Sequence, residues 1–317
     1  MSGPPTIGVD VGGTKIAGAV VDADGAIVAR RLVPTESDEP NSIVAALVKV
    51  ARELKAAAPA AAAVGVGAAG LVDTKRGVIL GAPNLAYRNV PVRDTLADRL
   101  GLPAVVDNDA NVAALAEAVH GAGRGAGDQI MVTVGTGIGG GIVIGGHIYR
   151  GHYGVGAELG HIVIDPDGPV CGCGNRGCWE AVASGTALGR IARQRVEGGA
   201  GADLLASVGG DLDAITGELV GEAAVAGSAF AKDVVAEIGR LLGIGLASIV
   251  NIFDPEVIVI GGGAAAGTGE LMLGPARESM RAHVLGVSWR TPVRIVPAAL
   301  GNDAGVVGAA TLARELL

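Results

Sequence analysis

Aromatic residues are scarce in this chain, whose 317 residues include two Trp, two Phe and three Tyr. Half of the residues are nevertheless hydrophobic, so the core must be built from Ala, Val, Leu and Ile. Glycine is over-used, at 54 residues, without a collagen-like period. A chain of this length can bury an ample core and suits two modest domains or one large one.

Long apolar runs are also missing. Residues 56–72 are mostly Ala and Gly and include Pro59, and residues 241–253 are too few to span a bilayer. No basic segment followed by an apolar one opens the chain, so we expect no secretory signal. Three closely spaced cysteines fit a reducing compartment better than a disulfide framework. We therefore expect a cytoplasmic protein.

Positive charge is in short supply, since 24 Lys and Arg residues stand against 32 Asp and Glu residues, for a net charge of −8. This balance argues against non-specific nucleic-acid binding, which depends on a basic surface. An anionic ligand must then be bound at a local site by backbone amides and a few cationic side chains.

The three cysteines lie within eight residues, and a histidine lies ten residues upstream of the first. Three thiolates and one imidazole form a closed tetrahedral set, which suits a structural zinc because no coordination position remains for water. Buried thiols acting as small hydrophobes are the alternative, but interleaved glycines and polar neighbours favour the metal. The four candidate ligands are His161, Cys171, Cys173 and Cys178.

Two glycine-tipped hairpins are predicted. Residues 6–21 indicate a strand, a glycine turn and a second strand, and residues 131–144 repeat the pattern. Their separation suggests an internal duplication, with one unit per domain. Amides and hydroxyls at such tips suit a phosphate, although the tips differ from the Walker pattern and one alone would be an ordinary hairpin. The tip residues are Gly12, Gly13, Thr14, Thr136 and Gly137, with Asp10 placed to hold magnesium through water.

Two further segments carry candidate ligand-binding residues. Residues 256–260 predict a buried strand that runs into Gly261, Gly262 and Gly263. Residues 103–118 predict a strand that becomes a helix, with polar side chains at the strand's carboxyl end, where open α/β sheets bind ligands. Helix capping is the alternative for these residues, and we expect one of them to cap. They are Asp107, Asn108, Asp109 and Asn111.

The remaining pattern alternates helices and strands. Further helices are expected at 41–58, 92–100, 184–195, 217–226, 229–250, 270–283 and 304–317, and further strands at 27–33, 62–68, 77–81 and 293–297. Residues 197–213 are glycine-rich and predict a loop or short excursion.

Glu-x-Gly-His followed by Cys-x-Cys-Gly-x-x-Gly-Cys-x-Glu, beginning at Glu158 and ending at Glu180, resembles the sugar kinases of the ROK family (repressor, open reading frame, kinase). Within that family the chain is most similar to ATP-dependent glucokinases of actinobacterial type. The resemblance implies a two-domain, actin-like α/β ATPase fold, shared with Hsp70 and ribonuclease H, with an active-site cleft between domains. It implies a smaller domain at 1–120 plus 304–317 and a larger one at 121–303.

The resemblance also implies residue roles for phosphoryl transfer from ATP, with Mg²⁺, to the 6-hydroxyl of D-glucose. Asp109 would be the catalytic base. The hexose would be held by Asn84, Asn108, Asp109, Glu158, His161 and Glu180. The nucleotide would be held by Asp10, Gly12, Gly13, Thr14, Lys15, Thr136, Gly137, Gly261, Gly262 and Gly263. A homodimer or homotetramer is expected.

Other readings stay open from the sequence. N-acetylmannosamine kinases and fructokinases share these motifs. Polyphosphate could replace ATP, although residues 256–263, which resemble the family's adenosine-binding segment, favour ATP. A sugar-sensing ROK regulator would carry a helix-turn-helix before the first hairpin, and only nine residues precede Asp10 here. A non-catalytic, zinc-stabilised sugar-binding protein would not need the full nucleotide set.

Overall fold

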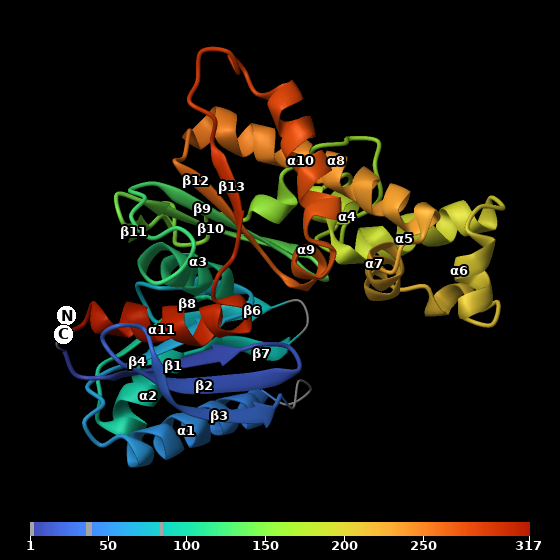
Figure 1. Ribbon diagram of the computed structural model, residues 1–317. Helices are drawn as coiled ribbons and strands as arrows, with labels where there is room; N and C mark the ends of the chain where they lie inside the picture. Colours follow the sequence, from blue (N-terminus) through green and yellow to red (C-terminus); the bar gives the residue numbers. More distant parts are fainter. Residues whose placement is uncertain (1–2, 36–39, 83–84) are drawn as a thin grey trace. The chain divides into compact units, whose positions relative to one another are not determined.

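The computed structural model describes residues 3–35, 40–82 and 85–317 (Figure 1). The chain divides into two compact units. Unit 1 comprises residues 1–131, 141–157 and 298–317, and unit 2 comprises residues 132–140 and 158–297. The domain bounds expected from the resemblance, 1–120 plus 304–317 and 121–303, stay a prediction, because these compact units are not domain boundaries.

The first five-stranded sheet has the order β3-β2-β1-β4-β8. Its first three strands form antiparallel hairpins, and β4 and β8 continue the sheet in parallel with β1. These strands confirm the first predicted hairpin and the strands that follow it. They are β1 (Thr6–Val11), β2 (Lys15–Val21), β3 (Ile27–Pro34), β4 (Val64–Ala68) and β8 (Ala104–Asn108). A small sheet contains β5 (Leu71–Asp73), β6 (Val78–Ala82) and β7 (Leu85–Val90).

Helices cover both faces of the first sheet. Figure 1 shows α1 (Pro40–Ala57) and α2 (Val92–Leu100) on one face and α11 (Ala304–Arg314) on the other. A Cβ on Gly8 or Gly65 would lie 1.9 Å from the carbonyl oxygen of Val306 or Ala309, so the helix backbone rests directly on β1 and β4. The last helix contacts α3 (Asp109–Val119) as well as β1 and β4.

The second five-stranded sheet has the order β11-β10-β9-β12-β13. This order matches the first sheet, with a hairpin, an outer antiparallel strand on one side and two later strands on the other. The match supports the duplication expected from the two glycine-tipped hairpins. The strands are β9 (Gln129–Val134), β10 (Ile138–Ile144), β11 (His147–Ile148), β12 (Val257–Gly261) and β13 (Arg294–Pro297).

The helices of unit 2 pack around the long helix α8 (Ala229–Phe253), which contacts α10 (Glu270–His283), α7 (Gly217–Val225), α5 (Gly185–Glu197) and α4 (Trp179–Ala183). Helix α8 is long and apolar enough to cross a membrane, but most of its apolar stretch is buried in this unit, as in a core helix. The remaining elements are α6 (Ala202–Ser207), α9 (Gly263–Thr268) and the 3-10 turns η1 (Leu159–His161), η2 (Leu212–Ala214) and η3 (Gly301–Asp303).

The glycine-rich segment at 197–213 is an excursion that contains α6 and η2. Leu204 is the buried residue of α6, so a single apolar anchor holds this short helix. One such anchor leaves too little periodicity for the helix to be predicted from the sequence.

Candidate active site

Asp107 organises the carboxyl end of β8. It is 1 % exposed, and its Oδ1 accepts hydrogen bonds from the Asn108 N–H (2.7 Å) and the Asn111 Nδ2 (2.9 Å). Its Oδ2 accepts a hydrogen bond from Arg150 Nε at 2.6 Å. Arg150 was not identified from the sequence, because the ion pair joins residues 43 positions apart in the chain. The pair neutralises a buried carboxylate beside the predicted base.

Asn108 caps α3. Its side-chain oxygen accepts hydrogen bonds from the N–H groups of Ala110 (2.8 Å) and Asn111 (3.2 Å), and its amide nitrogen donates to the Gly70 carbonyl at 3.0 Å. The expected capping role therefore falls to Asn108. Asp109 occupies the first helical position, where its Oδ1 accepts a hydrogen bond from the Ala110 N–H at 2.9 Å.

The carboxyls of Asp10 and Asp109 influence each other. The pKa of Asp10 is raised to about 7, mainly by burial and also by the charge of Asp109, while Lys15 opposes the rise. Burial also raises the pKa of Asp109, against the effect of its hydrogen bond from the backbone N–H of Ala110. Two buried acids in this state favour a bound cation, or a proton, over two free charges.

Gly305 is a further residue that the sequence did not single out. A Cβ at this position would lie 2.5 Å from Asp10 Oδ2, so the Asp10 carboxyl rests against the first turn of α11. That close approach requires a glycine. The partial positive charge at a helix N-terminus also favours the ionised carboxylate there.

The first hairpin tip is closed by backbone bonds. The Gly12 N–H donates to the Lys15 carbonyl at 3.0 Å, and the Thr35 hydroxyl donates to the Gly12 carbonyl at 2.9 Å. Thr35 also donates its N–H to the Thr14 carbonyl, so the residue that follows β3 fixes the tip. No heavy atom lies within 4 Å of a Cβ built on Gly13, so this position is open to a ligand. Asn84 lies outside the described residues.

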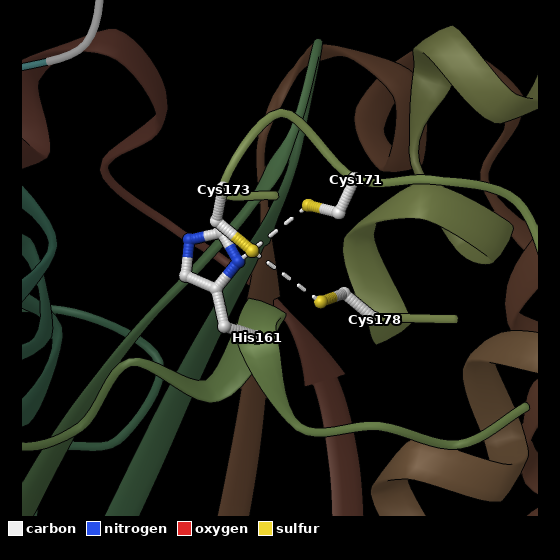
Figure 2. Close-up of side chains that lie close together, drawn as sticks. All are labelled: His161, Cys171, Cys173 and Cys178. Carbon is white, nitrogen blue, oxygen red and sulfur yellow. Dashed lines mark hydrogen bonds between the residues drawn. The ribbon is translucent and has the colours of Figure 1, made fainter. Parts of the chain in front are cut away.

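The four predicted metal ligands converge in unit 2 (Figure 2). Their donor atoms all lie within 4.8 Å of one another. Cys171 Sγ is 3.7 Å from His161 Nδ1, and Cys173 Sγ is 3.6 Å from Cys178 Sγ. The edges of a tetrahedron with zinc–ligand bonds of ordinary length are about 3.6–3.8 Å, so the spacing fits Zn²⁺.

Tight backbone turns produce this convergence. Gly174 and Gly177 have φ of 92° and 69°, and a Cβ on Gly177 would lie 1.5 Å from the Asp165 carbonyl oxygen. The Cys171 N–H donates to the Asn175 carbonyl at 2.7 Å, which closes the loop between the first and last thiols. His161 turns Nδ1 toward the sulfurs, so Nε2 is the ring nitrogen left for another partner.

Glu180 links the metal cluster to the second hairpin. Its Oε1 lies 3.7 Å from Cys171 Sγ, and its Oε2 accepts a hydrogen bond from the Ile138 N–H at 3.0 Å. A Cβ on Gly137 would lie 2.1 Å from that same oxygen, so the hairpin needs glycine there. Glu158 precedes η1 and accepts the His161 N–H on its carbonyl at 3.1 Å.

A cavity of about 710 Å³ lies between the second hairpin, α5, α7 and α9, within the usual size range of ligand pockets. The hairpin is held to α5, because Gly185 donates its N–H to the Gly135 carbonyl at 2.8 Å and Thr186 its hydroxyl to the Thr136 carbonyl at 2.8 Å. The cavity joins the predicted residues Thr136 and Gly263 to residues that sequence reasoning missed. These include Thr186, Arg193, Thr216, Glu218 and Thr268.

The end of β12 approaches β9 closely, since a Cβ on Gly262 would lie 2.5 Å from the carbonyl carbon and oxygen of Val134. With φ at 89°, Gly262 turns the chain into α9, whose first residue lines the cavity. The three predicted glycine segments thus have different local roles: two hairpin tips, and one strand-to-helix turn.

Two sheets of matching order, glycine-tipped hairpins, an acidic strand end and a Cys3His cluster define a sugar kinase of the actin-like class. The chain belongs to the ROK family, whose family model matches residues 6–316.

Named relatives agree with this assignment. A glucokinase from Streptomyces coelicolor is 46 % identical over 312 residues, covering 98 % of each chain. A glucokinase from Halalkalibacterium halodurans is 38 % identical over 319 residues, covering 98 % of this chain and 94 % of that protein. The crystal structure of a ROK-family glucokinase from Streptomyces griseus, in complex with glucose and AMPPNP, matches with a TM-score of 0.86 and 46 % identity, covering 98 % of this chain and 99 % of that one.

Proposed function

We propose that this chain transfers the γ-phosphoryl group of ATP to the 6-hydroxyl of D-glucose, giving glucose 6-phosphate and ADP. The observation that carries the proposal is that the second hairpin contacts both a cavity and Glu180, next to the metal cluster. Thr136 lines the nucleotide-sized cavity, and two residues later the Ile138 N–H binds Glu180 beside the metal cluster. A phosphate-type loop and a sugar-type carboxylate therefore lie within a few residues of each other, as transfer between bound substrates requires.

Asp109 is the proposed base. Its raised pKa makes it a stronger proton acceptor than an ordinary carboxylate, so it can take the proton of the attacking hydroxyl. Lys15 and the tip residues Gly12, Gly13 and Thr14 bind the phosphates, Thr136 and Gly137 complete this set, and Asp10 contributes through Mg²⁺. Mg²⁺ bound with the nucleotide neutralises phosphate charge, and Asp10 is the carboxylate placed to hold it.

The hexose is held by Asn84, Asn108, Glu158, His161 and Glu180 in this proposal. Zinc in the Cys3His cluster is structural, since four protein ligands fill its tetrahedral shell. His161 Nδ1 faces the sulfurs, so Nε2 is available to a sugar hydroxyl. Second partners of a ligating imidazole fix its orientation, so metal occupancy and sugar affinity are coupled.

The adenosine end of the nucleotide is assigned to Gly261, Gly262 and Gly263, of which Gly263 lines the cavity. We further propose that the chain acts in the cytoplasm as a homodimer or homotetramer, with the domains at 1–120 plus 304–317 and at 121–303 closing during turnover.

The test is a coupled ADP-release assay with glucose, mannose, fructose, N-acetylglucosamine and N-acetylmannosamine, run with ATP and separately with polyphosphate. We expect glucose with ATP to give the highest kcat/KM, and phosphorus NMR of the product to show a 6-phosphate. A higher kcat/KM for N-acetylmannosamine or fructose would refute glucose as the substrate. Absence of ADP release with every sugar would refute the kinase assignment itself.

A further inference from the structure

A second cavity, of about 700 Å³, lies within unit 1 between α1, α2 and β7. Helix α1 contacts both of the other elements, so one helix holds the two sides of the cavity together. The volume is within the usual range of ligand pockets. None of the lining residues is assigned to the sugar, the nucleotide or the metal, so the proposed reaction does not account for this cavity.

The charge of the cavity is opposite in sign to that of the chain. Four of its lining residues are cationic, and they come from three different elements. They are Lys49 and Arg52 of α1, Arg88 of β7 and Arg99 of α2. Lys49 and Arg52 are three positions apart, which places them on the same face of their helix. The chain has a net charge of −8, so four cations around one hollow are a local reversal of the overall balance.

The fold leaves most of this positive charge unmatched. Across the residues that the structure describes, no ion pair involves Lys49, Arg52 or Arg99. Glu53, the acidic residue of the lining, is paired with Arg31 at 3.3 Å, so its charge is already matched. Like charges that share a concave surface repel one another, and a bound anion would remove that repulsion.

The lining is also partly apolar. Asn89 and Thr95 add an amide and a hydroxyl oxygen, which suit the hydroxyl groups of a ligand. The larger apolar side chains suit a carbon skeleton, so the cavity fits an organic anion better than a bare inorganic ion. These apolar residues are Val44, Val48, Val90 and Pro91.

We propose that this cavity binds a small sugar phosphate. A phosphate ester carries up to about two negative charges and three strong acceptor oxygens, so it can contact several cations at once. The planar guanidinium of Arg also matches the geometry of phosphate oxygens. A nucleic-acid backbone would need an extended basic surface, which this acidic chain lacks. The inference is independent of the proposed catalytic activity, because it concerns binding by residues that the activity does not use.

Calorimetric titration with ribose 5-phosphate tests the proposal. The protein is first saturated with glucose, Mg²⁺ and a non-hydrolysable ATP analogue, so that the proposed active site is occupied. Ribose 5-phosphate should still bind. Inorganic phosphate should bind more weakly because it lacks the carbon skeleton, and ribose should bind more weakly because it lacks the charge. Added NaCl should weaken binding, because salt screens the attraction between exposed charges.

Arg52→Gln and Arg99→Gln identify the site. Each should weaken the binding of ribose 5-phosphate by about tenfold, the usual effect of losing one hydrogen bond to a charged group, and the double variant should abolish it. The matched control is Arg281→Gln. Arg281 is an exposed arginine in the last turn of α10, as Arg99 is in the last turn of α2, but it lies outside the cavity. This control changes the net charge equally and should leave binding unchanged.

Three results would overturn the proposal. The first is a wild type that does not bind ribose 5-phosphate. The second is binding that survives in the double variant or falls equally in Arg281→Gln, since the effect of charge would then be general. The third is inorganic phosphate binding as tightly as ribose 5-phosphate, which would exclude a sugar phosphate as the preferred ligand. Circular dichroism checks that each variant is folded, and the titrations stand whether or not the chain phosphorylates glucose.

Discussion

Replacing Asp10 by Asn should stabilise the free protein while impairing catalysis. In the fold, burial and the charge of Asp109 raise the pKa of Asp10 from 3.8 to about 7. A raised carboxyl pKa means that ionisation is harder in the folded chain than in the unfolded one. As pH rises through this window the unfolded chain loses the proton first, so the free energy of unfolding falls. Asn keeps the shape of the side chain and cannot ionise.

The size of the effect follows from the shift. Each pKa unit corresponds to about 1.4 kcal/mol, so a shift of about 3 units sets a ceiling of about 4 kcal/mol. This shift already includes the attraction between Asp10 and Lys15, which lowers the pKa, so the expected gain in the free energy of unfolding is up to about 4 kcal/mol. The gain in the free energy of unfolding should develop between pH 3.8 and about pH 7, the two pKa values of Asp10, and stay constant at higher pH.

The assay is urea unfolding of wild type and Asp10→Asn at about pH 5 and about pH 8, without divalent cations. Asp98→Asn, an exposed carboxyl change in α2, is the control and should leave the free energy of unfolding unchanged at both pH values. Mg²⁺ with a non-hydrolysable ATP analogue should stabilise wild type more than Asp10→Asn. An equal or lower stability of Asp10→Asn at the higher pH would refute the reasoning.

Three further predictions concern the site. Asp109→Asn should lower turnover by about 10²–10⁴-fold, the usual loss for a general base, with glucose binding measured by calorimetry largely kept; more than a tenth of wild-type turnover would exclude this role. Cys173→Ser should lower zinc content, thermal stability and glucose affinity together without rescue by Mg²⁺, whereas a fully active zinc-free wild type would contradict the link. Gly305→Ala should raise the KM for ATP by displacing the Asp10 carboxyl, while Gly274→Ala, in a helix with no atom within 4 Å of the new Cβ, should not.

The sequence by itself determined the elements whose information is local. Glycine at a hairpin tip and alternating apolar residues give a strand-turn-strand wherever they occur, and both hairpins formed as predicted. The four candidate zinc ligands could also be predicted from the sequence. The three thiols are close together in the chain, and the glycines between them allow the tight turns that bring the thiols together. The helix at 92–100 was predicted with its observed bounds, since Gly101 ends it in the left-handed conformation.

Only the tertiary structure decided which side chains support the site from a distance. Arg150 reaches Asp107 from β11's following loop, and Gly305 lies against Asp10 because the last helix returns to the first sheet. Nothing in the local pattern of either residue differs from that of many others. Asn108, not its acidic neighbours, caps α3, since the cap is chosen by backbone geometry at the end of β8. These contacts depend on how distant segments pack, and the local periodicity of a sequence does not encode that packing.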